Sequence, residues 1–370
     1  MNCKFNLLSI DGGGIRGIIP AIILVEIEKR TNKRISELFD LIAGTSTGGL
    51  VALALTKPNP VQPNIAFYTA KDIVELYRNQ GRRIFDEQES FLDDALEQAY
   101  NQFRNLLQNL PQRIDLPEID INSLRGPKFP STGREEVLTE FLGETLIKEA
   151  LKEVFITSYD TELRTPIFFT SNEQTQTEER RNFRKICADY TMKQAAMATS
   201  AAPTYFAPYK VDTSATESGY YSLIDGGVFA NNPTSLATLE AIISHRKATK
   251  ETLKLDDILV VSLGTGSLTR QYPYENIKNW GCLDWGRSLL GIVFDGQSES
   301  VACQLEQLLP ESEEEPQRYY RFQGLLNDAN DDIDVTTPEN IAELEKVARL
   351  IVQQQDRDLD RLCAQLVEKR

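Results

Sequence analysis

The feature that most constrains the fold is a short apolar run followed by a glycine-rich turn and an apolar helix, which occurs twice within the first sixty residues. The first run, Phe5–Ile10, leads through Asp11 and three glycines into a predicted helix at residues 18–30. The second run, residues 38–43, leads through small residues into an apolar helix at residues 50–55. Nearly continuous apolar runs of this length are typical of strands that are buried on both faces of a sheet. The alternation predicts an α/β fold with a mostly parallel central sheet flanked by helices.

The rest of the chain predicts one domain with two additions. Further strands and helices are expected at residues 135–151, 153–159, 166–170, 192–200, 220–224, 233–245 and 257–263. Residues 59–135 resemble an insertion or helical cap, because amphipathic stretches lead into a segment rich in Pro, Asn, Gln and Gly. Residues 271–370 are acidic and close with a helix that starts near residue 338. We therefore expect a main domain over residues 1–270 and a mainly helical C-terminal extension, packed on the same domain, over residues 271–370.

The charge balance excludes several kinds of partner. The chain carries 40 Lys and Arg against 55 Asp and Glu, a formal net charge of −15. Phosphate backbones select basic surfaces, so we expect no nucleic-acid partner. No apolar stretch approaches the roughly 18 residues that a membrane-spanning helix needs, and the first residues lack the apolar core of a signal peptide. These features predict a soluble, cytoplasmic protein.

The sequence contains few residues that could bind a metal ion. The chain has one histidine and five scattered cysteines, with no C-x-x-C pair. Structural and catalytic zinc sites depend on clustered Cys and His ligands. We therefore expect no metal site and reduced, buried thiols.

A candidate nucleophile lies between the second predicted strand and its helix. Residues 44–48 read Gly-Thr-Ser-Thr-Gly and match the pattern G-x-S-x-G. Glycines on either side allow a sharp, strained turn that exposes the serine, here Ser46, at the start of a helix. A turn that merely packs strand against helix is the alternative interpretation of the same residues.

A serine nucleophile needs a base, and the chain offers two candidates. His245, the single histidine, falls at the end of a predicted helix that begins near Pro233, about 18 Å from the helix start at ~1.5 Å per residue. Sites in open α/β sheets form near helix starts, so we expect a structural role for His245. Asp225 closes an apolar strand and should emerge at the same edge of the sheet as Ser46. Its position alone fits a turn or N-cap aspartate equally well.

The glycine-rich loop after the first strand allows two interpretations. Residues 12–17 satisfy G-x-G-x-x-G, which is found in dinucleotide-binding proteins. Against that function, Asp11 would repel a pyrophosphate, and the second strand does not end in an acidic ribose-binding residue. The other use is an oxyanion hole, in which glycine N–H groups with the cation of Arg16 nearby stabilise negative charge as it develops.

Several separated motifs together resemble one known family, the patatin-like phospholipases. These motifs, in chain order, are SIDGGGIRG (9–17), GTSTGG (44–49), ATSAAPTYFAP (198–208), DGGVFANNP (225–233), VVSLGTG (260–266) and FDGQSE (294–299). The agreement of several motifs in the same order, across most of the chain, makes the resemblance specific.

The resemblance implies a three-layer α/β fold and assigns roles to the motif residues. It implies that Ser46 is the nucleophile, that Asp225 is its base, and that no histidine takes part. The glycine-rich loop would form the oxyanion site, with the precise role of its arginine left open between the oxyanion and a substrate phosphate. The remaining glycines belong to the motifs themselves. The oxyanion residues are Gly12, Gly13, Gly14 and Arg16, and the further motif residues are Gly17, Gly44, Gly48, Gly226 and Gly227.

The function that follows from the resemblance is a serine acyl-ester hydrolase. It would release fatty acids from membrane phospholipids or other glycerolipids, with neither cofactor nor metal, while bound transiently at membranes. One alternative is a catalytically silent or nucleotide-regulated effector of the same fold, and a less favoured one is a dinucleotide-binding oxidoreductase. A nucleotide activator and an oligomeric state stay open at this point.

Overall fold

The computed structural model describes residues 3–86, 126–176, 184–187, 189–267, 269–311 and 316–368. These residues contain a nine-stranded sheet in which most neighbouring strands follow the order β5-β4-β3-β2-β1-β8-β9, with β7 also pairing with β3 and β6 with β7. The strands are β1 (Phe5–Ile10), β2 (Leu41–Thr45), β3 (Glu153–Asp160), β4 (Thr165–Thr170), β5 (Arg184–Ile186), β6 (Tyr209–Asp212), β7 (Tyr220–Asp225), β8 (Ile258–Leu263) and β9 (Tyr319–Phe322).

The centre of the sheet is parallel and one end is mixed. β3, β2, β1, β8 and β9 are joined by parallel pairing, whereas β4 and β7 both run antiparallel to β3. The carboxyl ends of β1, β2 and β8 therefore share one edge, where α/β proteins place their ligands. This is the mostly parallel sheet that the sequence predicts.

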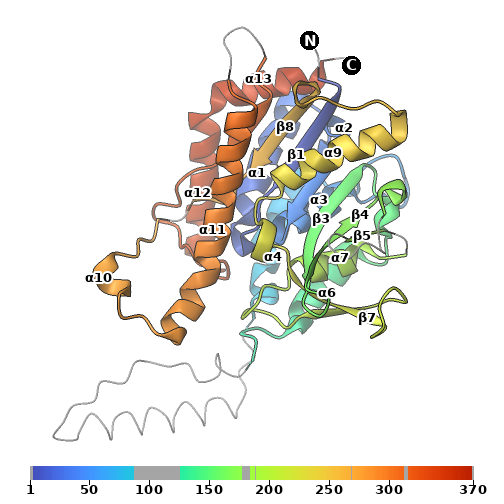
Figure 1. The fold of residues 1–370 in the computed structure, drawn as a ribbon. Coiled ribbons are helices and arrows are strands. Elements are labelled where there is room, and N and C mark those ends of the chain that lie inside the picture. Colours follow the sequence, from blue (N-terminus) through green and yellow to red (C-terminus); the bar gives the residue numbers. More distant parts are fainter. Residues whose placement is uncertain are drawn as a thin grey trace, which may run out of the picture.

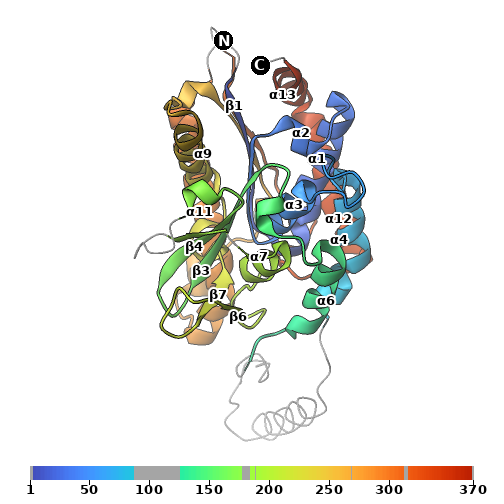
Figure 2. The same cartoon turned by 90° about the vertical axis from the view of Figure 1, so that its right-hand side faces the viewer.

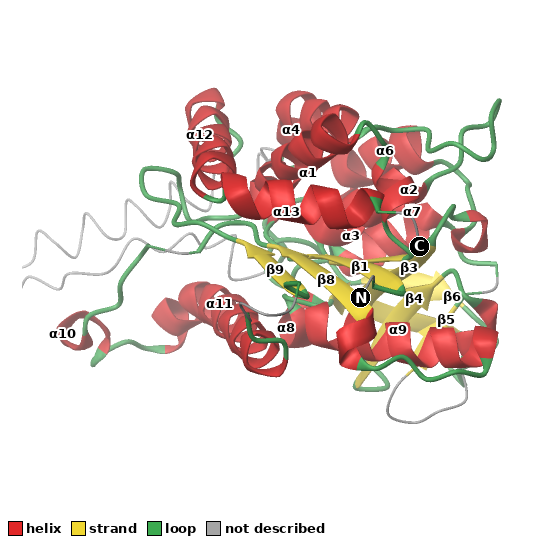
Figure 3. Ribbon diagram, turned by 90° about the horizontal axis from the view of Figure 1, so that it is seen from above, coloured by secondary structure: helices red, strands yellow, loops and turns green. Residues whose placement is uncertain are grey.

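Helices cover both faces of this sheet, which makes a three-layer α/β fold (Figures 1–3). One layer contains α1, α3, α4, α7 and α12, and the opposite layer contains α8, α9 and α11. The helices are α1 (Ile18–Thr31), α2 (Ile35–Leu38), α3 (Thr47–Thr56), α4 (Ala70–Ile84), α6 (Ser131–Leu142), α7 (Met192–Thr199), α8 (Gly227–Ala230), α9 (Thr234–Thr249), α10 (Tyr274–Ile277), α11 (Cys282–Leu308), α12 (Pro338–Gln354) and α13 (Asp356–Val367).

The strands bury side chains on both faces, which explains their apolar sequences. On β1, Leu8 and Ile10 join the core beneath α1 and α3, whereas Phe5 and Leu7 join the core on the opposite side, next to α9. Side chains alternate between the faces of a strand, so a strand covered on both sides has no position for a polar stripe. None of the described helices is both long enough and apolar enough to span a bilayer.

Several boundaries differ from those expected. The second strand begins at Leu41 rather than at residue 38, because residues 35–38 form the short helix α2. The helix expected over residues 135–151 is α6, which ends before Gly143, whose φ of 59° is incompatible with a helix. The long final helix is divided at Gln355 into α12 and α13.

The last hundred residues are part of the layered core. β9 pairs with β8 at the edge of the main sheet, and α12 and α13 both pack against α1. The described residues from 271 onward thus contain helices and also add a strand to the main sheet. Within the residues expected to form a cap, α4 and α6 pack against each other, and residues 87–125, including the amphipathic stretch from residue 90, lie outside the described residues.

Candidate active site

Ser46 lies at a strained turn between β2 and α3. Its backbone has φ 53° and ψ −123°, a combination that L-residues with a side chain rarely adopt. The turn is closely packed, since a Cβ on Gly44 would lie 2.2 Å from the carbonyl oxygen of Gly48, and a Cβ on Gly48 would lie 2.2 Å from that of Ile10. Only glycine permits these backbone approaches. This is the strand–turn–helix setting of an exposed catalytic serine.

Asp225 reaches Ser46 because two strands end against each other along β3. β2 pairs with β3 up to Thr157, and β7 pairs with β3 from Asp160 to Ser158 in the opposite direction. β4 occupies the other edge of β3 over the same residues, so β2 and β7 share one edge and their carboxyl ends meet there. The register thus brings Asp225, at the end of β7, next to the turn that follows β2.

The environment of Asp225 makes its carboxylate a better proton acceptor than that of an ordinary aspartate. The residue is only 1% exposed, and its Oδ1 accepts a hydrogen bond of 2.7 Å from the amide of Gly227. Burial raises the pKa of Asp225 to about 6. Three weaker effects lower this pKa: hydrogen bonds with the Ser46 side chain and the Gly227 amide, and the positive charge of Arg134. Oδ2 makes no fully formed hydrogen bond with any described residue. Catalytic hydrogen bonds are often long before substrate binds, so Oδ2 is free to receive a proton.

The glycine-rich loop after β1 faces the same region. The amide of Gly12 donates to the carbonyl of Asn231 at 3.0 Å, and a Cβ on Gly12 would lie 3.4 Å from the Cβ of Ser46. The amides of Gly13 and Gly14 donate no hydrogen bond to an acceptor among the described residues. An oxyanion hole requires unpaired amides of this kind.

The loop is also covered by other parts of the protein. Gly14 has φ +58°, and a Cβ there would lie 2.2 Å from the carbonyl oxygen of Ile333. Gly13 is similarly close to the side chain of Thr265. Because these contacts come from the protein itself, the loop offers little space for a pyrophosphate, and the dinucleotide interpretation is not favoured.

Arg16 points away from the apolar side of this region. Its side chain is 5% exposed, and Nε donates to the carbonyl of Gly13 at 3.3 Å. Burial lowers the pKa of Arg16, an effect that Asp331 and other carboxylates oppose. Arg16 lines a second pocket, in which charged residues such as Asp331 lie beside apolar ones such as Leu290, and Ser46 is not among the residues that line it.

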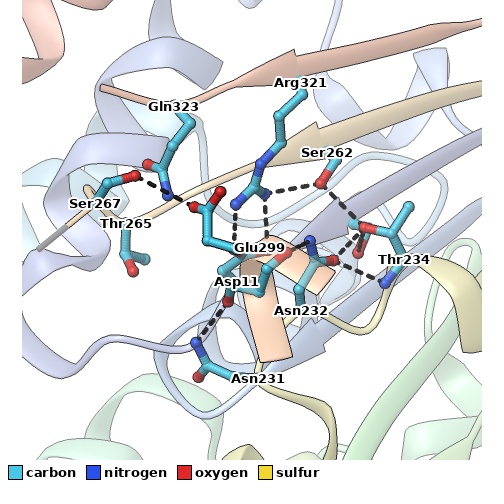
Figure 4. A network of polar contacts seen from close by, with 12 residues as sticks. Asp11, Asn231, Asn232, Thr234, Ser262, Thr265, Ser267, Glu299, Arg321 and Gln323 are labelled. Carbon is cyan, nitrogen blue, oxygen red and sulfur yellow. Dashed lines mark hydrogen bonds and ion pairs between the residues drawn. The ribbon is translucent and has the colours of Figure 1, made fainter. Parts of the chain in front are cut away.

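Asp11 holds the loop in place from the side of the last strand. Arg321 of β9 donates to Oδ1 and Oδ2 of Asp11 at 3.0 and 2.6 Å, and it also donates to Ser262 at 2.8 Å (Figure 4). The hydroxyl of Thr265 donates to the carbonyl of Gly12 at 2.7 Å. With both oxygens bound by one guanidinium, Asp11 anchors the loop. Burial raises the pKa of Asp11, an effect that Arg321 opposes.

An apolar pocket opens beside Ser46. Its lining combines the glycine-rich loop after β1, the first turn of α3, the side of α4 and the segment after α7. Nearly all of the exposed lining is carbon, which suits an acyl chain. The apolar and aromatic residues that line it are Ile15, Leu50, Tyr77, Ile84, Phe85, Ala202, Phe206 and Ile333.

Arg134 is a site residue that sequence reasoning missed. It belongs to α6, is 1% exposed, and lines the apolar pocket together with Ser46. Its guanidinium carbon lies 4.1 Å from the centre of the Phe206 ring. A lone arginine in a helix carries no sequence signal, because most such residues face water.

The other motif residues support the turns. Gly17 packs against Thr47 and Tyr77, and Gly226 packs against Thr157. His245 lies at the opposite edge of the sheet, where its ring contacts Phe5 at the start of β1, 6.4 Å between centroids. Among the described residues, no group of three or more His, Cys, Asp or Glu side chains could hold a metal ion.

The chain has matches among protein families, known proteins and solved structures. The family model described as "Patatin-like phospholipase" matches residues 8–238, a range that contains Ser46 and Asp225. "Probable inactive patatin-3-Kuras 1" of Solanum tuberosum is 34% identical over 295 residues, which cover 75% of this chain and 68% of that protein. "Patatin-like protein 2" of Arabidopsis thaliana is 32% identical over 362 residues, which cover 92% of this chain and 81% of that protein. The crystal structure of VipD from Legionella pneumophila matches with a TM-score of 0.40 and 14% identity, over 95% of this chain and 67% of that one.

Proposed function

The chain belongs to the patatin-like phospholipase family, which makes it a lipid acyl hydrolase, and we propose that it releases fatty acids from membrane glycerolipids through Ser46 and Asp225. The observation that carries this proposal is the meeting of a strained serine and a buried carboxylate beside an apolar pocket.

In the proposed reaction, Asp225 acts first as a general base. The carboxylate takes the proton of the Ser46 hydroxyl while the oxygen attacks the ester carbonyl carbon. The amides of Gly13 and Gly14 stabilise the negative charge that develops on the carbonyl oxygen. The tetrahedral intermediate collapses, the alcohol leaves with the proton from Asp225, and an acyl group remains on Ser46. Water then attacks this ester and passes its proton to Asp225. As the second tetrahedral intermediate collapses, Asp225 returns this proton to the Ser46 oxygen, and the fatty acid is released.

The raised pKa of Asp225 supports this role. A carboxylate with its ordinary pKa of 3.8 is a weak base, whereas a value of about 6 brings it closer to the proton that it must accept. The group is still mostly ionised at neutral pH. We therefore expect kcat/KM to rise with pH and to reach half of its maximum near pH 6.

The apolar pocket beside Ser46 and the pocket that contains Arg16 support a lipid as the substrate. The acyl chain would lie in the pocket lined by Leu50, Phe85 and Phe206, whereas the alcohol half of the ester would lie toward the pocket that contains Arg16. Transient binding at a membrane surface and a cytoplasmic location belong to the same proposal. A nucleotide activator is a prediction that no feature of the described residues favours.

The test is lipid mass spectrometry of a defined vesicle mixture incubated with the protein. Vesicles of phosphatidylcholine, phosphatidylethanolamine and phosphatidylglycerol should yield free fatty acid and lysolipid with the wild-type protein. Ser46→Ala should abolish this release, whereas Ser218→Ala, in the exposed turn before β7, should leave it unchanged. Release that persists at the wild-type rate in Ser46→Ala would overturn the proposal.

A catalytically silent protein is the second candidate, and the name of the potato relative favours testing it. Ser46 of a silent protein would not react with a fluorophosphonate probe. A covalent adduct on Ser46, located by peptide mass spectrometry, would exclude this alternative.

A further inference from the structure

The buried guanidinium of Arg134 contacts a segment that lies between the two proposed catalytic residues. Nη1 of Arg134 donates to the carbonyl oxygen of Ser200, and it lies 3.3 Å from the hydroxyl of the same residue. Phe206 stacks on the guanidinium from another side. Arg134 thus holds the chain just after α7 from within the pocket.

The segment Thr199–Ala201 also binds the backbones of Ser46 and Asp225. The amide of Ser46 donates to the hydroxyl oxygen of Thr199 at 2.8 Å. The amide of Asp225 donates to the carbonyl oxygen of Ala201 at 2.9 Å. Three consecutive residues therefore join the nucleophile, Arg134 and the base. A displacement of this segment would move both proposed catalytic residues at once.

A charged arginine here is difficult to explain by packing alone. Nε and Nη2 of Arg134 are buried and have no hydrogen-bond partner among the described residues. Burial of an incompletely paired cation destabilises a protein compared with an apolar side chain of similar size. Burial lowers the pKa of Arg134 to about 10, so the group is still cationic throughout the neutral range.

The charge of Arg134 acts on Asp225. The groups that interact electrostatically with Arg134 are Asp225, Tyr209 of β6 and Glu135 of α6. In turn, Ser46, the Gly227 amide and Arg134 all lower the pKa of Asp225, against the effect of burial. Arg134 is thus the cation that favours the ionised form of the proposed base.

We propose that Arg134 is a positioning residue, which holds the Thr199–Ala201 segment against Ser46 and Asp225 and supplies the positive charge that keeps the base ionised. This inference rests on the proposed function. It assigns the family motif around residues 198–208 a physical task, because the segment is the shared support of the nucleophile and the base. It also explains why an arginine lies in a pocket that is otherwise apolar.

The test is the pH dependence of kcat/KM for p-nitrophenyl butyrate between pH 5 and pH 9. Arg134→Met removes the charge, so the rising limb should move to higher pH by about one unit, the lower end of what a nearby opposite charge produces. At pH 5 this shift lowers the rate by roughly tenfold beyond any loss seen on the plateau. Arg134→Lys keeps the charge but shortens the side chain. Its rising limb should lie close to that of the wild type, while the plateau falls because the contact with Ser200 is weakened.

Two further variants separate position from charge. Arg349→Met removes an exposed arginine of α12, and it should change neither the limb nor the plateau. Thr199→Val removes the acceptor for the Ser46 amide, and it should lower the plateau without moving the limb. If Arg134→Met does not fold, Arg134→Gln, which keeps a donor for Ser200, gives the same comparison.

Each outcome decides the proposal. The role of Arg134 would be overturned if the rising limb of the kcat/KM profile lay at the same pH in wild type and Arg134→Met, or if Arg349→Met moved it by as much as Arg134→Met does. The proposed function would stand in either case. Hydrolysis that does not depend on Ser46, or a wild-type profile that Asp225→Asn leaves intact, would overturn both.

Discussion

Replacement of Asp225 by asparagine should remove activity and, at the same time, stabilise the protein at neutral pH. Burial raises the pKa of this carboxyl from 3.8 to about 6, a difference of about 2 units. Each unit corresponds to about 1.4 kcal/mol, so ionisation of the folded protein costs about 3 kcal/mol above pH 6. Asparagine has the same shape, cannot ionise, and keeps an oxygen for the hydrogen bond from the Gly227 amide.

The sign of the effect follows from which state holds the proton. Between pH 3.8 and 6 the folded wild-type protein retains the proton of Asp225 that the unfolded chain has already released. The free energy of unfolding contributed by this group is therefore complete below pH 3.8 and is lost as the pH rises through about 6. The advantage of Asp225→Asn over the wild type should grow across the same range, from near zero to about 3 kcal/mol.

The assay is urea denaturation of wild type and Asp225→Asn at several pH values from 4 to 8. The difference between the two proteins isolates Asp225, because the other groups titrate in both. Asp212→Asn, at the exposed end of β6, provides a control for the replacement of an exposed carboxylate by an amide. A constant difference between Asp225→Asn and the wild type, or one that shrinks as the pH rises, would refute the argued environment of Asp225.

Three other predictions concern the support of the site. His245→Ala should leave kcat/KM within about twofold of wild type, because the residue lies at the opposite edge of the sheet; a loss of ~10³-fold, as for removal of a triad member, would contradict a mechanism without histidine. Gly14→Ala should reduce both hydrolysis and thermal stability, because its Cβ would lie 2.2 Å from the carbonyl oxygen of Ile333; wild-type values for both would show that this contact is not tight. Arg321→Met should lower the free energy of unfolding, measured in urea, by roughly 3–5 kcal/mol, because it leaves the carboxylate of Asp11 buried without its partner. The double variant Arg321→Met with Asp11→Asn should recover part of that loss. No recovery would argue against coupling between the two residues.

The serine turn could be predicted from the sequence because its requirements are local. Residues 44 and 48 must be glycine, because a Cβ on Gly44 would strike the carbonyl oxygen of Gly48 and a Cβ on Gly48 would strike that of Ile10. The apolar strand and helix on either side of this turn are visible as runs of residues. The convergence of Ser46 and Asp225 was expected for a different reason from the one observed. The sequence interpretation placed Asp225 at the end of another strand whose carboxyl end shares the edge of Ser46, whereas β7 runs antiparallel to β3 and meets β2 end to end. Pairing between distant strands is not encoded in any single segment.

Other parts of the site depend on contacts that no local pattern reveals. Arg134 lies in helix α6, and its side chain is buried against Ser200 and Phe206 in the segment after α7. Arg321 belongs to the four-residue strand β9, whose sequence Tyr-Tyr-Arg-Phe has neither the length nor the apolar continuity that predicts a strand. Its function becomes clear only when the strand is seen beside β8, where the arginine reaches Asp11 (Figure 4).

The predicted division of the chain into a main domain, a cap and a C-terminal extension also depends on contacts between distant segments. The division at residue 270 stays a prediction, and β9 shows that residues beyond it contribute to the main sheet. The cap expected over residues 59–135 is also still a prediction. Its described part includes Phe85 and the C-terminal end of α4, which line the apolar pocket. We propose that this part covers the acyl chain of a bound lipid.

The most direct test of the central claim is the rate at which a fluorophosphonate labels Ser46 in the wild type and in Asp225→Asn, measured by peptide mass spectrometry across pH 5 to pH 9. Our account predicts a single adduct on Ser46, with a wild-type rate that reaches half of its maximum near pH 6. In Asp225→Asn the rate should fall by ~10³-fold or more and lose this pH dependence. Labelling of another serine, or a rate at Ser46 that Asp225→Asn leaves unchanged, would contradict it.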